Sequence, residues 1–289
     1  MITSDKPAGE RTSEGPAARH WRELVERRRR QMDAAYAALD RSGKDYWARR
    51  LNRASMLRRR AADEDPLLQM LLACASTATT VLDVGAGAGR YSRALAPRVA
   101  RVTAVEPDNA MAELLAQAIH DEQLGNVELV RSSWQDAVVE PSDLVLCAHV
   151  LYPIPEPVAF VRKLEQSARR ACFLALRETA PEPEPLSLLW QYYHGEPRYL
   201  QPGFLEAYNL LHELGIYANV RIVRVNGSMW SFETLDQAVS SLREHLILPD
   251  GEAIDAHLRR ELEGALVAEG DWLTLPMRPP PSAILWWNT

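Results

Sequence analysis

One segment of the chain has the residue types and spacing of a ligand-binding turn. Val81–Gly89 reads Val-Leu-Asp-Val-Gly-Ala-Gly-Ala-Gly, an apolar strand that runs into a glycine-rich turn and then into a helix. Glycines in such a turn let backbone N–H groups approach a ligand where a Cβ would block it. A dinucleotide site spaces its glycines G-x-G-x-x-G, so that a pyrophosphate rests on the helix N-terminus. Here the spacing is G-x-G-x-G, and a carboxylate at Asp83 favours a ligand with a cationic group, such as an amino acid ammonium, over a pyrophosphate.

The segment resembles motif I of the class I S-adenosylmethionine-dependent methyltransferases, whose cofactor carries such an ammonium. A second apolar strand, in Val102–Asp108, ends in Glu106. The resemblance implies that this carboxylate accepts both ribose hydroxyls, since an ionised acid is an acceptor at both oxygens. Dinucleotide folds place an acid similarly, so Glu106 alone does not exclude NAD. The resemblance assigns these residues around the two strands to cofactor binding: Asp83, Gly85, Ala86, Gly87, Gly89, Glu106 and Pro107.

Two further strands continue the resemblance, which covers residues 67–178. Val127–Arg131 leads into a loop that borders the adenine in the family, and this implies cofactor contacts from Ser133, Trp134 and Gln135, with Asp136 as another acceptor for the adenine amine. A polar loop with one half-buried Trp is the alternative. Asp143–His149 is the fourth strand, and the resemblance implies that its last residues, Ala148 and His149, bind the cofactor at the edge where open α/β sheets bind ligands.

Methyl transfer needs a base only if the acceptor is protonated, because the cofactor supplies the reactivity and the protein mainly aligns the reactants. His149 is the best placed candidate base, His194 is the second, and Tyr152 is a candidate positioning group. A structural histidine is the alternative reading of each. No Asn-Pro-Pro-Tyr motif follows the fourth strand, which disfavours an enzyme that acts on exocyclic amines of nucleic-acid bases.

Aromatic residues on both sides of the resemblance could contact the acceptor. Tyr46 and Trp47 lie on predicted helices before motif I, which in this family often fold over the cofactor as a lid. Trp190 and Tyr193, in a stretch dense in aromatic and polar groups, could wall a pocket for a flat or cationic acceptor. Ordinary packing in a small aromatic core is the alternative for all four.

The alternation of strands and helices predicts the scaffold that positions these residues. It indicates an α/β fold with a doubly wound, seven-stranded, mostly parallel sheet, an N-terminal helical lid and helical insertions near the C-terminus. We expect a loose tail over residues 1–18, the lid over 19–65 and a methyltransferase domain over 66–289, with insertions at about 179–203 and 233–270. The second insertion is predicted as two helices, from Thr234 to Leu246 and from Glu252 to Ala268.

Composition indicates a cytoplasmic enzyme. The three cysteines are far apart and form no C-x-x-C pair, which argues against a disulfide framework or a structural zinc. The polar N-terminus has no apolar signal region, and no run of about 18 apolar residues occurs, so we expect neither secretion nor membrane spanning. The net charge of −6 is uneven, since residues 1–80 carry 16 Lys and Arg against 11 Asp and Glu.

The basic residues cluster at Arg27–Arg30, Arg49–Arg50 and Arg58–Arg60, and such clusters could bind RNA phosphates. Interleaved acids favour solvated helix faces instead. We therefore expect an enzyme that methylates a small molecule with S-adenosylmethionine. The alternatives are an RNA or protein methyltransferase that uses the arginines, a non-catalytic S-adenosylmethionine-binding module and, least favoured, a dinucleotide oxidoreductase.

Overall fold

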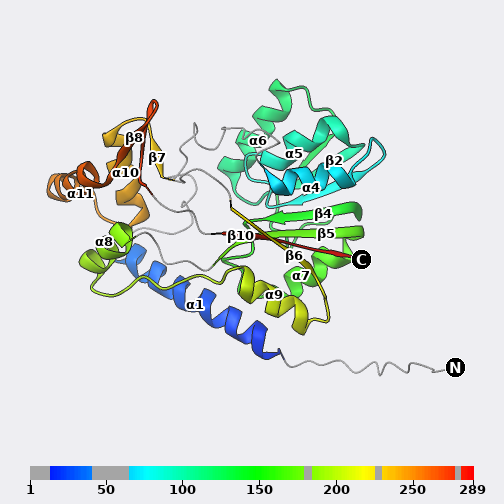
Figure 1. Cartoon of the computed structure of the whole chain (residues 1–289), viewed down its shortest axis with the longest axis horizontal. Helices are drawn as coiled ribbons and strands as arrows, with labels where there is room; N and C mark the ends of the chain where they lie inside the picture. The colour runs from blue at the N-terminus through cyan, green and yellow to red at the C-terminus, as the bar shows by residue number, and fades with distance from the viewer. Residues whose placement is uncertain (1–13, 41–64, 179–183, 225–229, 277–280) are drawn as a thin grey trace.

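The computed structural model describes residues 14–40, 65–178, 184–224, 230–276 and 281–289, and its centre is a seven-stranded sheet (Figure 1). The strand order is β3-β2-β1-β4-β5-β10-β6, in which β10 is antiparallel to both of its neighbours and the other pairs are parallel. This confirms the predicted sheet. Its strands are β1 (Thr80–Val84), β2 (Arg101–Val105), β3 (Val127–Val130), β4 (Ser142–Ala148), β5 (Ala168–Arg177), β6 (Asn219–Val223) and β10 (Ser282–Asn288).

Helices cover both faces of the sheet because its central strands are apolar on both sides. Along β1, Val81 packs in the core beneath α4 and α5, whereas Leu82 packs in the core beneath α7 and α9. The period of two residues therefore directs the side chain of Asp83 to the α5 face. The helices are α4 (Pro66–Cys74), α5 (Arg90–Leu95), α6 (Asn109–Asp121), α7 (Pro157–Gln166) and α9 (Phe204–Glu213), with a short 3-10 helix at Ala96–Arg98.

A second unit with its own core lies beside the sheet (Figure 1). It contains α8 (Glu184–His194), α10 (Leu235–His245) and α11 (Glu252–Ala265). It also contains a small sheet in the order β7-β9-β8, made of Ser231–Phe232, Trp272–Thr274 and Val267–Glu269. The predicted helix to Ala268 is therefore too long: the helix ends at Ala265, and Ala268 pairs with Leu273.

Helix α1 (Pro16–Ala37) contacts both units. Trp21 and Val25, in its first half, are buried in the core beneath α7 and α9, whereas Ala35 and Tyr36 belong to the core of the second unit. The helix begins inside the tail that was predicted to be loose and end at residue 18. A proline is favourable in the first helical turn, and Ala18 is completely buried. None of the described helices is long and apolar enough to cross a membrane.

Candidate functional site

The three glycines of the turn after β1 all have positive φ, which glycine adopts most easily, but their surroundings differ. A Cβ at Gly85 would lie 2.3 Å from a methyl of Val150, and one at Gly89 would lie 2.4 Å from a methyl of Leu115. A Cβ at Gly87 would meet no atom of the described residues within 4 Å. Two glycines therefore permit close packing, and Gly87 exposes its backbone to open space.

Asp83 lies behind this turn and accepts two hydrogen bonds from the first turn of α5. The backbone N–H and the hydroxyl of Ser92 donate to its Oδ2, at 3.2 Å and 2.6 Å. The carboxylate thus caps α5 from outside the helix, at the third helical position. Burial raises the pKa of Asp83 from its ordinary value of 3.8 to about 6, although the bonds from Ser92 oppose the shift.

Glu106 connects the turn to the next helix. Its Oε2 accepts a hydrogen bond from the N–H of Gly87 at 2.7 Å, and its Oε1 accepts one from the N–H of Asp108 at 2.8 Å. Burial is the main reason that its pKa is raised. Each carboxylate oxygen can accept more than one bond, so the group retains capacity for a diol beside Gly87. Pro107 is exposed next to it, whereas Ala86 is buried against Leu115.

The loop after β3 differs from the expectation at its tryptophan. Trp134 is 3% exposed and donates from Nε1 to the carbonyl of Phe160 on α7, and the Nζ of Lys163 lies 4.6 Å from its ring centroid. Its side chain faces the core, so Trp134 is not placed to stack on an adenine. Ser133 bonds to Asp136 within the loop, and Gln135 is exposed. Periodicity could not show which of these side chains faces inward.

His149 and Tyr152 do lie together at the carboxyl edge. His149 has a φ of +62°, which is unusual for a residue other than glycine, and its N–H donates to the carbonyl of Ala175 on β5. Its Nδ1 is 3.0 Å from the hydroxyl of Tyr152, which accepts a bond from the N–H of Arg177 at 2.7 Å. Burial raises the pKa of Tyr152 to about 12, so the phenol stays protonated at neutral pH. The contact of Val150 with Gly85 brings this loop beside the glycine turn.

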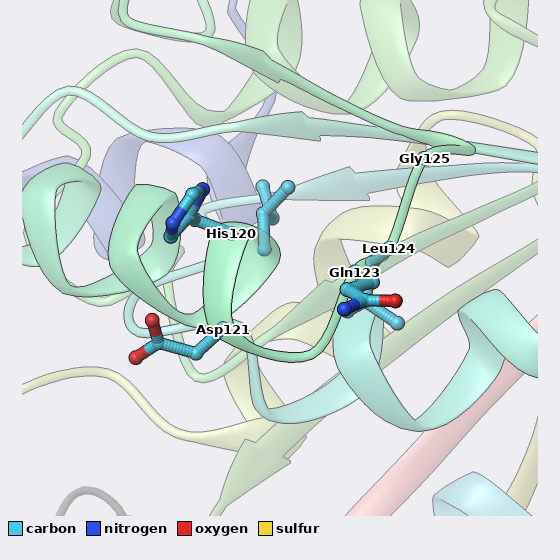
Figure 2. A pocket seen from close by; sticks show the side chains of 6 residues that line it. His120, Asp121, Gln123, Leu124 and Gly125 are labelled. Carbon is cyan, nitrogen blue, oxygen red and sulfur yellow. The ribbon is translucent and has the colours of Figure 1, made fainter.

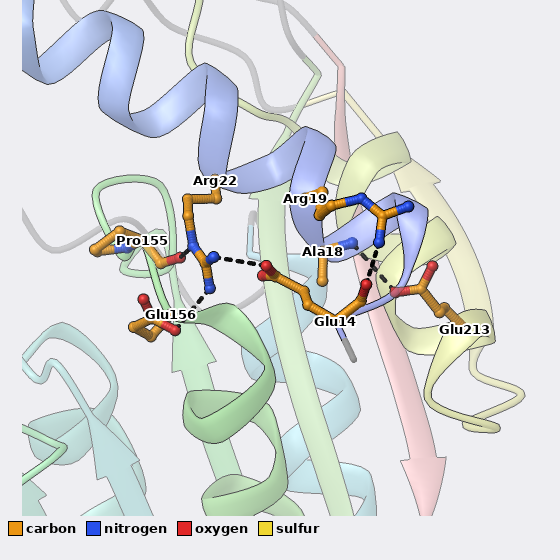
Figure 3. Close-up of polar contacts among 7 residues, drawn as sticks. All are labelled: Glu14, Ala18, Arg19, Arg22, Pro155, Glu156 and Glu213. Atoms are coloured by element: carbon orange, nitrogen blue, oxygen red, sulfur yellow. Dashed lines mark hydrogen bonds and ion pairs between the residues drawn. The ribbon is translucent and has the colours of Figure 1, made fainter. Parts of the chain in front are cut away.

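Helix α1 fixes the same loop from outside. Trp21 donates from Nε1 to the carbonyl of Ile154 at 2.9 Å. Arg22 bonds to the carbonyl of Pro155 and forms an ion pair with Glu156 at 2.9 Å (Figure 3). These contacts could not be predicted from local sequence patterns, because they join residues more than 130 positions apart.

The aromatic residues of α8 do not reach the carboxyl edge. Trp190 is completely buried in the second core, stacked on His194, whose Nε2 donates to the carbonyl of Leu246 at 2.7 Å. Tyr193 bonds to His257 of α11 at 2.7 Å. The alternative of a small aromatic core is thus the observed arrangement, and His194 is not placed to act as a base. Tyr46 and Trp47 lie outside the described residues.

A hollow at the C-terminal end of α6 is lined by His120, Asp121 and Gln123, among others (Figure 2). This segment leads into the start of β3, so it lies at the amino edge of the sheet. It contains none of the candidate residues, and ligands of open α/β sheets bind at the opposite edge.

Comparison with known proteins agrees with this geometry. Residues 82–176 match a family described as a methyltransferase domain. A protein of Methanosphaera stadtmanae named as a probable ribosomal RNA small subunit methyltransferase A is 30% identical over 101 residues, which are 35% of this chain and 36% of that protein. The chain thus matches only about a third of the length of this relative.

Solved structures extend the comparison to most of the chain. The protein BH2331 of Bacillus halodurans, which has been assigned as a methyltransferase, has a TM-score of 0.52 and 16% identity, over 79% of this chain and 99% of that one. A magnesium protoporphyrin IX methyltransferase from Synechocystis with bound S-adenosylhomocysteine has a TM-score of 0.48 and 20% identity, over 58% and 77%. At 16% identity, the similarity to BH2331 shows a shared fold and no more than that.

Proposed function

Because residues 82–176 form a methyltransferase domain of the class I S-adenosylmethionine-dependent family, we propose that the chain transfers a methyl group from S-adenosylmethionine to a small-molecule acceptor. One observation carries the proposal. Gly87 lies directly beside the carboxylate of Glu106, and no atom of the described residues lies within 4 Å of where its Cβ would be. The contact of Gly85 with Val150 then brings the loop of His149 next to the same turn.

The residues at the turn fit the cofactor group by group. Glu106 would accept the ribose hydroxyls, and the bare backbone at Gly87 would allow the nucleoside to approach closely. The Oδ1 of Asp83 would accept from the amino acid ammonium, because it receives no hydrogen bond from the described residues. Ser133 and Gln135, in the loop after β3, would border the adenine. When bound, the cofactor supplies an electrophilic methyl group on a sulfonium.

The protein would contribute alignment of the acceptor and, where the acceptor is protonated, a base. Tyr152 holds Nδ1 of His149, and the backbone N–H of His149 bonds to β5, so both the ring and the main chain are fixed. When Nδ1–H donates to the oxygen of Tyr152, Nε2 carries the lone pair that would take the proton of the acceptor. A base of this kind contributes roughly 10²–10⁴-fold to the rate.

The arginines of α1 favour a small acceptor over RNA. Arg27 lies 3.7 Å from the ring centroid of Tyr199, and Arg28 donates to the carbonyl of that residue at 2.8 Å. Arg29 and Arg30 each have an acid one turn away, at 3.7 Å and 3.6 Å. These side chains therefore do not present the one-sided basic surface that is typical of nucleic-acid binding.

An incubation with methyl-labelled S-adenosylmethionine and an extract of the source organism tests the proposal. After separation into small molecules, RNA and protein, we expect label among the small molecules, and the labelled compound identifies the acceptor. Label in RNA or protein would contradict the small acceptor while retaining the methyltransferase. Binding of S-adenosylmethionine without transfer to any fraction would favour a non-catalytic binding module.

A further inference from the structure

Ser92 is a buried residue that lies outside the glycine motif and donates two hydrogen bonds to Asp83, a residue of that motif. It occupies the third position of α5 and is completely buried. Both of its donors reach the same oxygen of Asp83, the hydroxyl at 2.6 Å and the N–H at 3.2 Å. The hydroxyl distance is typical of a hydrogen bond to a charged oxygen.

We propose that Ser92 is a positioning residue for cofactor binding, which holds the Asp83 carboxylate ionised and leaves Oδ1 to accept a hydrogen bond from the ammonium of S-adenosylmethionine. The inference rests on the proposed function, because it concerns the same cofactor site. The hydroxyl of Ser92 donates to Asp83, so Ser92 would affect the ligand only through that carboxylate.

The electrostatics of the surrounding groups explain why this carboxylate needs such support. Asp83 is 2% exposed, and the charge of Glu106 at the end of β2 also disfavours its ionised form. The two other titratable groups that couple to it are neutral: burial raises the pKa of both the Cys147 thiol on β4 and the Tyr91 phenol on α5 far above neutrality. No described cation opposes these effects, so the two bonds from Ser92 are the main local stabilisation of the charged form.

Ligand affinity against pH separates this role from a structural one. The probes are S-adenosylhomocysteine, which carries the ammonium, and 5′-methylthioadenosine, which lacks the amino acid part. For the unaltered protein, affinity for S-adenosylhomocysteine should fall as pH decreases through about 6, because the pKa of Asp83 is raised to about 6. In Ser92→Ala this fall should begin at higher pH, so that the two proteins bind similarly near pH 8 and differ by roughly tenfold near pH 6.

Two variants and the second probe complete the design. Ser142→Ala is the matched control, because Ser142 is also completely buried but its hydroxyl has no partner within the described chain. It should leave the pH profile unchanged. Ser92→Thr keeps a hydroxyl and should restore the profile even if it lowers stability. Between about pH 6 and pH 8, the affinity for 5′-methylthioadenosine should be the same in all of these proteins. Any pH dependence that Glu106 causes is common to all of them.

The outcomes distinguish the inference from the proposed function. A shifted midpoint in Ser92→Ala that Ser92→Thr reverses supports the inference. Binding of S-adenosylhomocysteine with the same pH profile in Ser92→Ala overturns the inference and leaves the proposed function intact. An unaltered protein that binds neither probe at any pH overturns the proposed function, and the inference with it.

Discussion

Glu213, the last residue of α9, accepts a hydrogen bond from the backbone N–H of Ala17 in the first turn of α1 at 2.7 Å. The next residue, Ala18, donates to the same carboxylate at 3.2 Å. Because Pro16 has no N–H, these two bonds satisfy the unpaired donors at the start of the helix. A negative charge at this end also interacts favourably with the helix dipole.

Substitution of Gly15 should uncap α1. An added Cβ would lie 2.1 Å from the carboxyl carbon of Glu213, so Gly15→Ala should displace that side chain and break both bonds. We expect a loss of about 1 kcal/mol in the free energy of unfolding, measured by urea denaturation. Gly251→Ala is the control, since Gly251 also precedes a helix but has 4.0 Å of clearance. Equal losses in both variants would contradict the role of Glu213.

Substitution of Gly87 should block the cofactor. Gly87→Val places a side chain in the open space beside Glu106, and we expect affinity for S-adenosylmethionine to fall at least tenfold, or about 1.4 kcal/mol, in calorimetry. Gly215→Val separates steric blocking from backbone strain, because Gly215 has positive φ and open space but lies after α9. The control should lose stability and keep its affinity. Glu106→Ala should weaken binding by a similar factor, since it removes the ribose acceptor.

Replacement of Asp83 should stabilise the protein in a pH-dependent way. Its pKa is about 6 in the folded protein, above the ordinary 3.8, so between these values the folded state binds more protons than the unfolded state. Its contribution therefore makes folding less favourable as pH rises from about 4 to about 6. A shift of about 2 units corresponds to about 3 kcal/mol.

We therefore expect Asp83→Asn to match the unaltered protein near pH 4 and to exceed it by up to about 3 kcal/mol near pH 7, in urea denaturation at each pH. The same variant should bind S-adenosylmethionine more weakly. A stability difference that does not change with pH would be evidence against the burial of a charged Asp83.

Substitution of His149 should separate transfer from binding. Asn tolerates positive φ, so His149→Asn keeps the backbone while removing the proposed base. With the acceptor that the labelling experiment identifies, in its unmethylated form, we expect the transfer rate to fall roughly 10²–10⁴-fold while S-adenosylmethionine affinity stays within about twofold. Tyr152→Phe should have a smaller effect and a changed pH profile. An unchanged rate in His149→Asn would assign the residue a structural role.

The exposed arginines of α1 should be dispensable. Arg29→Gln and Arg30→Gln remove side chains that are 69% and 72% exposed and whose ion pairs are with neighbouring turns. Each pair contributes only about 0.3–0.5 kcal/mol. We expect unchanged transfer and no change in its salt dependence. A transfer rate that falls in the double variant, most strongly at low salt and with a weaker salt dependence, would instead indicate a polyanionic substrate.

The sequence predicts those parts of the molecule that depend on local pattern. The sheet followed from apolar runs that alternate with helices, and the glycine turn followed from its spacing. The orientation of single aromatic side chains could not be predicted from local pattern. Trp134 is buried because α7 covers it, and Trp190 is buried because α10 and α11 cover it. The small sheet was also missed, since its strands have two or three residues and show no alternation.

The hydrogen bond between Ser92 and Asp83 could be predicted from the sequence. A serine in the first turn of a helix that follows a strand-end carboxylate is close enough to bond back to it, and the structure has this bond. Ser92 lies seven residues after Gly85, which places it in that first turn.

The position of α1 across two cores has a consequence for the order in which the protein is made. This helix is synthesised before the segments that it contacts: the partner of Ala17, Glu213, comes 196 residues later in the chain, and the partner of Trp21, Ile154, comes 133 residues later. Until those segments are synthesised, Trp21 and Val25 lack the core in which they are buried in the described part of the chain. During that interval Trp21 and Val25 are outside the core that later buries them, and apolar side chains exposed on a nascent chain favour chaperone binding or aggregation.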